Sequence, residues 1–411
     1  YYMEVAKPDT SPKAVIDASI DMGASDILFE PQSGRARIRV RTDGVLEEYG
    51  EVSKEDHSRF LDYLEKNASM KTRTDMNHEP MGIREGYFET DYNGRKVMLR
   101  ATVLSAIRGD MAAVRVLDPA NLTSLEELGF GGYHLNSYKE IVGENGIVLV
   151  TGPTGAGKTT TVYATLKHLD PRKKNIFTLE DPVEYPIDGI NQISVDRLVA
   201  DQSFPAYFSG ILRATPDVIY AGEIRDFEVA QTAFRAADIG HTILATAHSN
   251  DSERVMRHMM GMGIEHDKIY ALNGVVSQRL VRELCGGCKM EYSPDDVMNE
   301  KERQILKSFG IERAYRENPE GCGDCDYRGF DGRTGVFEVL DTRSDRIKEQ
   351  MILGGSSKDI RDIAMQEGQK IGNNLGQTAL GLVHDGKTSI HEVYRMFPGY
   401  NLVRKSPGYG K

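Results

Sequence analysis

The feature that most constrains this chain is the glycine-rich segment GPTGAGKTT at residues 152–160, which follows the apolar run 147–150. A loop of this pattern between a strand and a helix turns backbone N–H groups toward an anion at the helix N-terminus. Lys158 is expected to reach the β- and γ-phosphates of a nucleotide, and Thr159 to bind Mg²⁺. The segment predicts an ATP·Mg²⁺ site; the alternative is a glycine-rich turn that binds nothing. The expected nucleotide-binding residues here are Thr154, Gly155, Ala156, Gly157, Lys158, Thr159 and Thr160.

The surroundings of this loop predict an α/β fold. From residue 131, short apolar runs alternate with helical patterns, which is typical of a mostly parallel sheet covered on both faces. The expected strands are 146–151, 175–179, 217–221 and 242–246, with a helix opening at Thr159. Residues 1–118 read instead as a small α+β module, with a helix at 14–22, strands at 26–29, 35–41, 86–92, 95–103 and 112–116, and turns at Asp43-Gly44 and Asn93-Gly94.

The remaining boundaries follow changes in composition. We expect a linker at 119–130, an ATPase core at 131–282, a cysteine-bearing segment at 283–335, a helical region at 336–397 and a tail at 398–411. No apolar run reaches the roughly 18–20 residues needed to cross a bilayer, so a cytoplasmic protein without a transmembrane segment is expected. The formal charge of −11 argues against wholesale binding of nucleic acid.

Two acidic groups close predicted strands. Glu223 follows the strand at 217–221 and could orient and deprotonate the attacking water; alternatively it is a surface residue paired with Arg225. The cluster Glu180, Asp181 and Glu184 closes another strand and could bind Mg²⁺ or water, or could simply be a solvated acidic loop.

His241 and His248 bracket the strand at 242–246. His248 falls at its carboxyl end, where ligands bind in open α/β sheets. A phosphate-sensing role and an ordinary structural role both remain open for it.

Four cysteines form two C-x-x-C pairs, Cys285 with Cys288 and Cys322 with Cys325. Four thiolates satisfy a closed tetrahedral Zn²⁺ site, so a structural zinc is predicted, with a helix at 299–308 in the segment between the pairs. Buried free cysteines and a redox dithiol are the alternatives.

Four arginines alternate along the predicted strand 35–41 and share one face: Arg35, Arg37, Arg39 and Arg41. A solvated face is expected, and a nucleic-acid groove is the alternative.

Taken together, these motifs resemble the type II secretion and type IV pilus assembly (extension) ATPases of the secretion ATPase superfamily. Residues 152–160 resemble that family's Walker A motif, 177–185 its Asp box, 222–226 its Walker B motif and 240–251 its His box. The cysteine pairs favour the extension branch over the retraction branch, and the resemblance covers nearly the whole chain.

The resemblance implies a fold and further site residues. It implies a RecA-like P-loop ATPase domain preceded by a small α+β (PAS-like) domain, with a tetracysteine zinc segment and C-terminal helices. Glu223 and Glu184 would serve catalysis, His241 and His248 the nucleotide site, and Glu180 and Asp181 the Mg²⁺ ion. Arg100 and Arg115 of the N-terminal domain would reach the nucleotide of the ATPase domain.

The resemblance also implies a homo-hexameric motor at the cytoplasmic face of the inner membrane. It would act on a membrane platform protein and, indirectly, on pilin or pseudopilin subunits. A hexameric DNA translocase is the enzymatic alternative, although the acidic balance of the chain does not favour it. A nucleotide-gated scaffold without useful turnover is the other.

Overall fold

The computed structural model describes residues 9–74, 80–195, 203–247, 252–297, 299–370, 375–398 and 402. The main division of the chain falls between Asn121 and Leu122 and separates two compact units. The sequence places this boundary at residue 118, and the short helix η1 (Pro119–Asn121) fills the interval.

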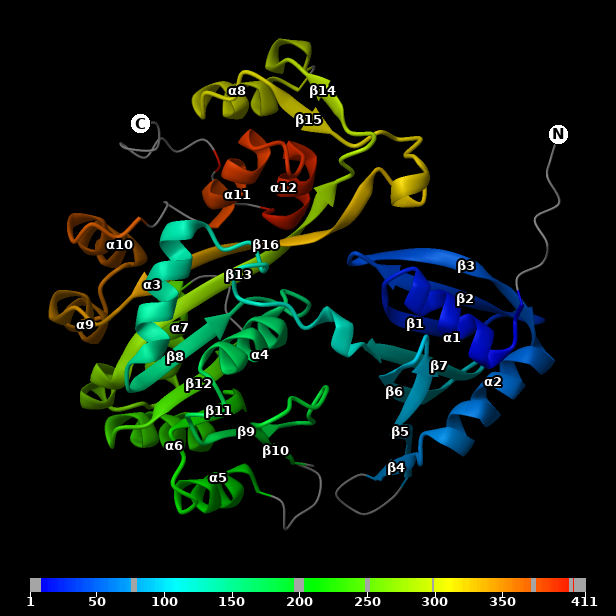
Figure 1. Ribbon diagram of the computed structural model, residues 1–411, viewed down its shortest axis with the longest axis horizontal. Helices are drawn as coiled ribbons and strands as arrows, with labels where there is room; N and C mark the ends of the chain where they lie inside the picture. The colour runs from blue at the N-terminus through cyan, green and yellow to red at the C-terminus, as the bar shows by residue number, and fades with distance from the viewer. Residues whose placement is uncertain are drawn as a thin grey trace. The chain divides into compact units, whose positions relative to one another are not determined.

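The first unit is a seven-stranded antiparallel sheet, in the order β3-β2-β1-β7-β6-β5-β4, with two helices (Figure 1). Its elements are α1 (Pro12–Asp21), β1 (Ala24–Pro31), β2 (Arg35–Thr42), β3 (Val45–Ser53), α2 (Lys54–Asn67), β4 (Lys71–Thr74), β5 (Pro80–Tyr92), β6 (Arg95–Ala106) and β7 (Gly109–Leu117). The predicted helix and strands of this region are confirmed. The predicted turns are also present, with positive φ at both residues of Asp43-Gly44 and of Asn93-Gly94.

Burial alternates along these strands because one face of the sheet is covered and the other is open. In β2, Ala36, Ile38 and Val40 are buried and the arginines between them are not. The buried face packs against α1 and α2, where Val15 and Phe60 belong to the same core cluster. The arginine face of β2 carries ion pairs with carboxylates of β1 and β3, as expected for a solvated face.

The second unit contains a seven-stranded sheet in the order β10-β9-β11-β12-β8-β13-β16. The first six strands are parallel, and β16 joins antiparallel to β13. Its first elements are α3 (Gly132–Gly143), β8 (Gly146–Thr151), α4 (Lys158–His168), β9 (Ile176–Glu180), β10 (Asn191–Ser194), α5 (Phe204–Leu212), β11 (Val218–Glu223), α6 (Phe227–Asp238) and β12 (Thr242–Ala247). The four strands predicted here are confirmed, and β8 and β12 are buried at every residue.

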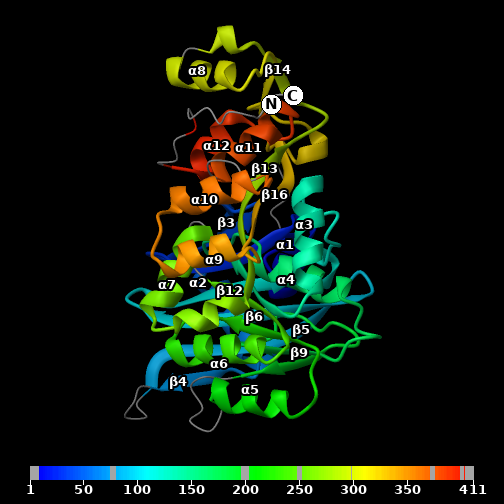
Figure 2. The same cartoon turned by 90° about the vertical axis from the view of Figure 1, so that its left-hand side faces the viewer.

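The later elements complete the sheet and add the C-terminal helices. They are α7 (Ser252–Gly261), η2 (His266–Ala271), β13 (Leu272–Leu284), β14 (Met290–Tyr292), η3 (Pro294–Asp296), α8 (Glu300–Ser308), β15 (Ala314–Arg316), η4 (Gly323–Cys325), β16 (Phe330–Asp341), α9 (Asp345–Ile352), α10 (Ser357–Gln366), α11 (Leu375–His384) and α12 (Ile390–Met396). The helix predicted between the cysteine pairs is confirmed as α8. Helices α8, α11 and α12 share one apolar cluster that includes Ile305, Leu380 and Val393, and α11 and α12 adjoin in both views (Figure 2).

Strands β13 and β16 differ from the expected segment boundaries. The sequence assigns residues 283–335 to a cysteine-bearing segment and 336–397 to helices, whereas β16 continues the sheet of the second unit through Asp341. β13 is fully buried over its first eight residues although it contains Asn273, Ser277 and Gln278. These polar residues interrupt the apolar run that normally marks a buried strand.

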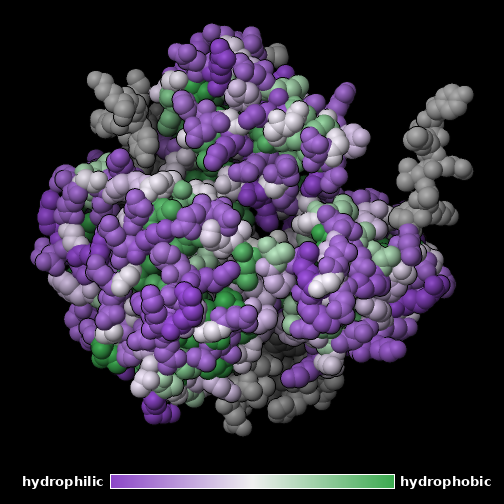
Figure 3. Space-filling view, viewed as in Figure 1, coloured by the Kyte–Doolittle hydropathy of each residue, from purple (hydrophilic) through white to green (hydrophobic). Residues whose placement is uncertain are grey.

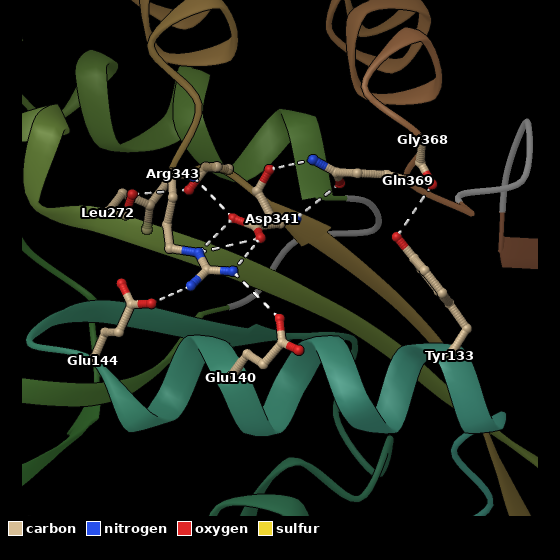
Figure 4. A network of polar contacts seen from close by, with 9 residues as sticks. Tyr133, Glu140, Glu144, Leu272, Asp341, Arg343, Gly368 and Gln369 are labelled. Atoms are coloured by element: carbon tan, nitrogen blue, oxygen red, sulfur yellow. Dashed lines mark hydrogen bonds and ion pairs between the residues drawn. The ribbon is translucent and has the colours of Figure 1, made fainter.

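A polar network joins α3 to the end of β16 (Figure 4). Arg343 forms ion pairs with Asp341, Glu144 and Glu140. The side chain of Gln369 contacts both main-chain polar groups of Asp341, accepting from its N–H at 3.1 Å and donating to its C=O at 2.7 Å. The carboxylate of Asp341 raises the pKa of Arg343, so this guanidinium stays charged. The network holds α3 against β16, the edge strand of the sheet.

Among the described residues, no helix combines the length and the apolar character that a membrane span requires. The face drawn in Figure 3 is largely hydrophilic, with small scattered apolar patches.

Candidate nucleotide site and cysteine cluster

The predicted phosphate-binding loop lies between the carboxyl end of β8 and the start of α4. Gly157 caps the helix in the left-handed region, at φ 83°, which favours glycine. Gly152 is required for a different reason: a Cβ there would lie 2.6 Å from the carbonyl oxygen of Gln278 and 2.9 Å from the Cβ of Ala156. The glycines therefore permit both the turn and a close approach of strand β13.

The side chain of Lys158 lies over the loop. Its Nζ donates to the carbonyl oxygens of Gly152 at 2.8 Å and Pro153 at 3.1 Å. Burial lowers the pKa of Lys158; the carboxylate of Glu223 opposes this shift, and the guanidinium of Arg279 adds to it. A partly buried ammonium held by carbonyl groups is suited to bind a phosphate, which would restore a full counter-charge.

Glu223 is the last residue of β11, on the same edge of the sheet as the loop and two strands away from β8. Gly222 makes this position possible, because its φ is 56° and a Cβ there would lie 2.6 Å from the carbonyl oxygen of Leu179. Glu223 forms an ion pair with Arg225, as the surface alternative expects. However, the Glu223 side chain is only 16% exposed against 55% for Arg225. It is therefore a largely buried carboxylate beside the loop lysine, and a catalytic role stays a prediction.

The acidic cluster after β9 divides into buried and open members. Glu180 is buried and accepts hydrogen bonds from Tyr163 of α4 and from Thr178. It therefore connects β9 to the helix that begins at the phosphate loop. Asp181 is exposed, 3.9 Å from Arg225, and Glu184 is half-buried. Their assignments to Mg²⁺ and to catalysis stay predictions.

Of the two histidines predicted at the nucleotide site, the structure describes only His241. His248 lies outside the described residues. His241 directly precedes β12, and its Nδ1 is 3.0 Å from the carbonyl oxygen of Ala236. The next residue, Thr242, is the first of β12 and pairs with Gly146, the first of the parallel strand β8. The phosphate loop follows the opposite end of β8. A strand length of about 20 Å separates the two edges, so a contact between His241 and a nucleotide in this chain's own loop is not supported.

Arg100 and Arg115 lie directly opposite each other on β6 and β7. Residues paired in this way share one face of the sheet. Arg115 also forms an ion pair with Asp26, at 3.0 Å, and Asp26 lies 3.6 Å from Arg41. The open face of the first unit thus carries three neighbouring guanidinium groups, of Arg41, Arg115 and Arg100, and two of them, Arg41 and Arg115, lie against the same carboxylate of Asp26.

The four cysteines come together as predicted. Their sulfur atoms all lie within 4.8 Å of one another, and Sγ–Sγ distances of 3.7, 3.8 and 3.9 Å join Cys285 to Cys322, Cys288 to Cys325 and Cys322 to Cys325. Tetrahedral zinc with bonds of about 2.3 Å requires a sulfur separation of about 3.8 Å. The geometry therefore fits zinc. A two-residue redox dithiol would not need both pairs.

The main chain around the cluster favours thiolate. The N–H groups of Cys322 and Gly329 donate to the Sγ of Cys325 at 3.3 and 3.2 Å. Burial raises the pKa of Cys325, but these two hydrogen bonds, together with those from the thiols of Cys288 and Cys285, outweigh it and bring the pKa to about 6. Hydrogen-bond donors that support a coordinating sulfur are typical of metal sites.

The sequence motifs missed two residues of β13 that border the loop. Gln278 is 1% exposed and its Nε2 donates to the carbonyl oxygen of Ala156 at 2.6 Å. Arg279 is also buried and contributes to the electrostatic environment of Lys158. The available signal was the polar pair itself, which lies between the apolar pairs Val275-Val276 and Leu280-Val281 of the strand.

Comparison with known proteins places the chain in a family. The sequence profile of the family described as "Type II/IV secretion system protein" matches residues 8–395. The chain is 34% identical over 389 residues to the "Type II secretion system ATPase E" of Vibrio cholerae, covering 93% of this chain and 74% of that protein. It is 35% identical to the "Type IV pilus assembly ATPase PilB" of Thermus thermophilus, with 93% of this chain and 42% of that protein covered.

Solved structures agree with the fold. The pilus retraction motor PilT with bound ADP superposes with a TM-score of 0.60 at 23% identity, covering 93% of this chain and 96% of that one. The ATPase DotB of Legionella pneumophila gives 0.65 at 16% identity, covering 94% and 95%. At these identities the likeness concerns the fold alone. The profile match and the sequence relatives carry the conclusion that the chain belongs to the family of type II/IV secretion system proteins.

Proposed function

We propose that this chain is an ATP-hydrolysing motor that powers type IV pilus assembly or type II secretion. The observation that carries the proposal is that Lys158, a cation in a phosphate-binding loop, lies within the electrostatic influence of Glu223, a largely buried carboxylate on the same sheet edge. The sequence relatives named as secretion and pilus assembly ATPases support the same activity.

Each residue of the site would have a defined task. The N–H groups of the loop and the ammonium of Lys158 would bind the β- and γ-phosphates. Glu223 would orient a water and take its proton as the water oxygen bonds to the γ-phosphorus and the bond from the γ-phosphorus to the bridging oxygen breaks, releasing ADP and phosphate. Glu184 would support Glu223. Thr159, Glu180 and Asp181 would hold Mg²⁺, which neutralises phosphate charge when bound. His248 stays a candidate for sensing the γ-phosphate.

Arg100 and Arg115 would add positive charge from the first unit. Adjacent like charges on one face are unfavourable unless counter-charges are present. Asp26 supplies one to Arg115 and Arg41, and a phosphate anion would supply further negative charge. Contacts of this kind would couple the state of the nucleotide to the position of the first unit.

The wider assembly is proposed from the resemblance to the family. The motor would be a homo-hexamer at the cytoplasmic face of the inner membrane and would transmit domain movements to a platform protein that adds pilin or pseudopilin subunits. The four cysteines would hold one structural Zn²⁺, which their separations fit.

Phosphate release by the full chain tests the proposal. Wild-type protein should hydrolyse ATP at a steady rate, and Lys158→Ala should lose both nucleotide binding and turnover while keeping its thermal unfolding temperature within a few degrees. Binding without turnover by the wild type would favour the nucleotide-gated scaffold. Strong stimulation by duplex DNA would favour the translocase.

A further inference from the structure

Gln278 connects strand β13 to the phosphate loop from below. Its side chain is buried, and its Nε2 donates to the carbonyl oxygen of Ala156 at 2.6 Å. Its main-chain carbonyl oxygen lies 2.6 Å from where a Cβ of Gly152 would be, and a Cβ at Gly157 would lie 3.3 Å from its Nε2. One residue therefore lies close to both ends of the loop.

The contact with Ala156 controls the direction of a neighbouring N–H. The carbonyl of Ala156 and the N–H of Gly157 belong to the same planar trans peptide, so they point in opposite directions. Holding the carbonyl down toward β13 turns the N–H of Gly157 up, away from the sheet. That is the direction in which a phosphate loop presents its donors at the start of a helix.

The side-chain amide of Gln278 has one orientation that allows the hydrogen bond to Ala156. Its Oε1 is buried and, among the described residues, has no hydrogen-bond partner. The reverse orientation of the amide would place two acceptors, Oε1 and the carbonyl oxygen of Ala156, against each other. A buried acceptor without a partner costs free energy, so a residue retained here at that cost points to a role in the loop.

We propose that Gln278 is a positioning residue that sets the phosphate affinity of the loop by fixing the peptide between Ala156 and Gly157. The inference rests on the proposed ATPase function. It assigns Gln278 no contact with the nucleotide: the residue acts through the N–H of Gly157, so it should affect binding of ADP and ATP alike and the chemical step much less.

Strand β13 offers a matched control. Asn273 is also a buried amide, 6% exposed, and its Nδ2 donates to the carbonyl oxygen of Asn145 at 2.8 Å. It makes the same kind of bond from the same strand, but at the opposite end of β8, away from the phosphate loop. Gln278→Leu and Asn273→Leu each remove one such bond.

The test measures the KM for ATP, kcat and the Kd for ADP in the full-length chain. Gln278→Leu should raise KM and Kd about tenfold, the loss expected for one buried hydrogen bond, and change kcat less than about threefold. Asn273→Leu should lower the unfolding temperature but leave KM and Kd within about twofold of wild type.

An unchanged Kd in Gln278→Leu, or an equal rise in both variants, would overturn the inference. If Gln278→Leu does not fold, Gln278→Asn keeps the amide but is one methylene too short to reach Ala156, and should raise the Kd at least threefold. Wild-type protein without ATPase activity would contradict the proposed function separately, because the ADP measurements would still decide the role of Gln278.

Discussion

The two sheets of this protein present charged residues in opposite ways. In the antiparallel sheet of the first unit, charged side chains alternate with buried ones along the strands, so Arg100 and Arg115 lie in mid-strand on an open face. In the parallel sheet, β8 and β12 are buried throughout, so the residues proposed for catalysis lie at or beyond the strand ends. Glu223 is the last residue of β11, and Lys158 begins the helix that follows β8.

The difference teaches how precisely each region can hold a reacting group. A side chain at the end of a buried strand is fixed by neighbours on several sides, as Glu223 is by the close approach of Gly222 to β9. A side chain on an open sheet face has water on one side and can move to meet a ligand. We therefore expect the chemistry at the parallel sheet and adjustable electrostatic support from the antiparallel one.

Removing the base at the strand end should have the largest effect. Glu223→Gln should retain ATP binding but lose hydrolysis by roughly two or more orders of magnitude, because the amide cannot take the proton of water. Phosphate release and ADP binding would measure this. Arg225→Ala is the control, since it removes the ion pair and keeps the carboxylate. Equal losses in both variants would show that the ion pair is what matters.

Removing charge from the open face should have an intermediate effect. Arg100→Ala or Arg115→Ala should reduce turnover at least tenfold with oligomeric state preserved, because a guanidinium near the γ-phosphate stabilises developing charge. Arg35→Ala is matched to Arg115→Ala, since Arg35 also forms an exposed ion pair, with Glu51 at 2.7 Å. Exposed pairs contribute about 0–1 kcal/mol. If all three variants behave alike, Arg100 and Arg115 do not take part in catalysis.

The cysteine cluster should affect turnover least. Purified protein should contain about one zinc per chain by elemental analysis, and Cys322→Ser should lower the metal content and the unfolding temperature. ADP affinity should stay near the wild-type value, because the cluster lies beyond the end of β13 and not at the loop. A fully folded, metal-free wild type would contradict the zinc assignment.

The sequence was most informative where the signal is local. The loop and its flanking strand and helix, the turns at Asp43-Gly44 and Asn93-Gly94 and the paired cysteines are all short patterns, and the structure confirms each of them. The cysteine spacing predicts convergence because two-residue spacings position thiols for one metal.

Contacts between distant segments could not be predicted in this way. The hydrogen bond from Gln278 to Ala156 spans 122 residues, and no pattern near either residue indicates it. The role of His241 was taken from the family resemblance, and the structure places this residue before β12, at the edge of the sheet opposite the phosphate loop of this chain. The buried polar residues of β13 hide the strand from a search for apolar runs. The hydrogen bonds of Asn273 and Gln278 are made with distant segments, which the sequence alone does not reveal.

The course of β13 has a mechanical consequence. The strand runs from Gln278 at the loop to Leu284, next to Cys285, and is paired with β16 from Gly274 to Leu284, with one shift in register between Arg282 and Leu284. Six residues of extended chain span about 20 Å, and a paired strand cannot lengthen without losing its hydrogen bonds. The phosphate loop and the cysteine cluster are therefore connected by one paired strand, so a displacement of this strand at the loop would also move the cysteine cluster.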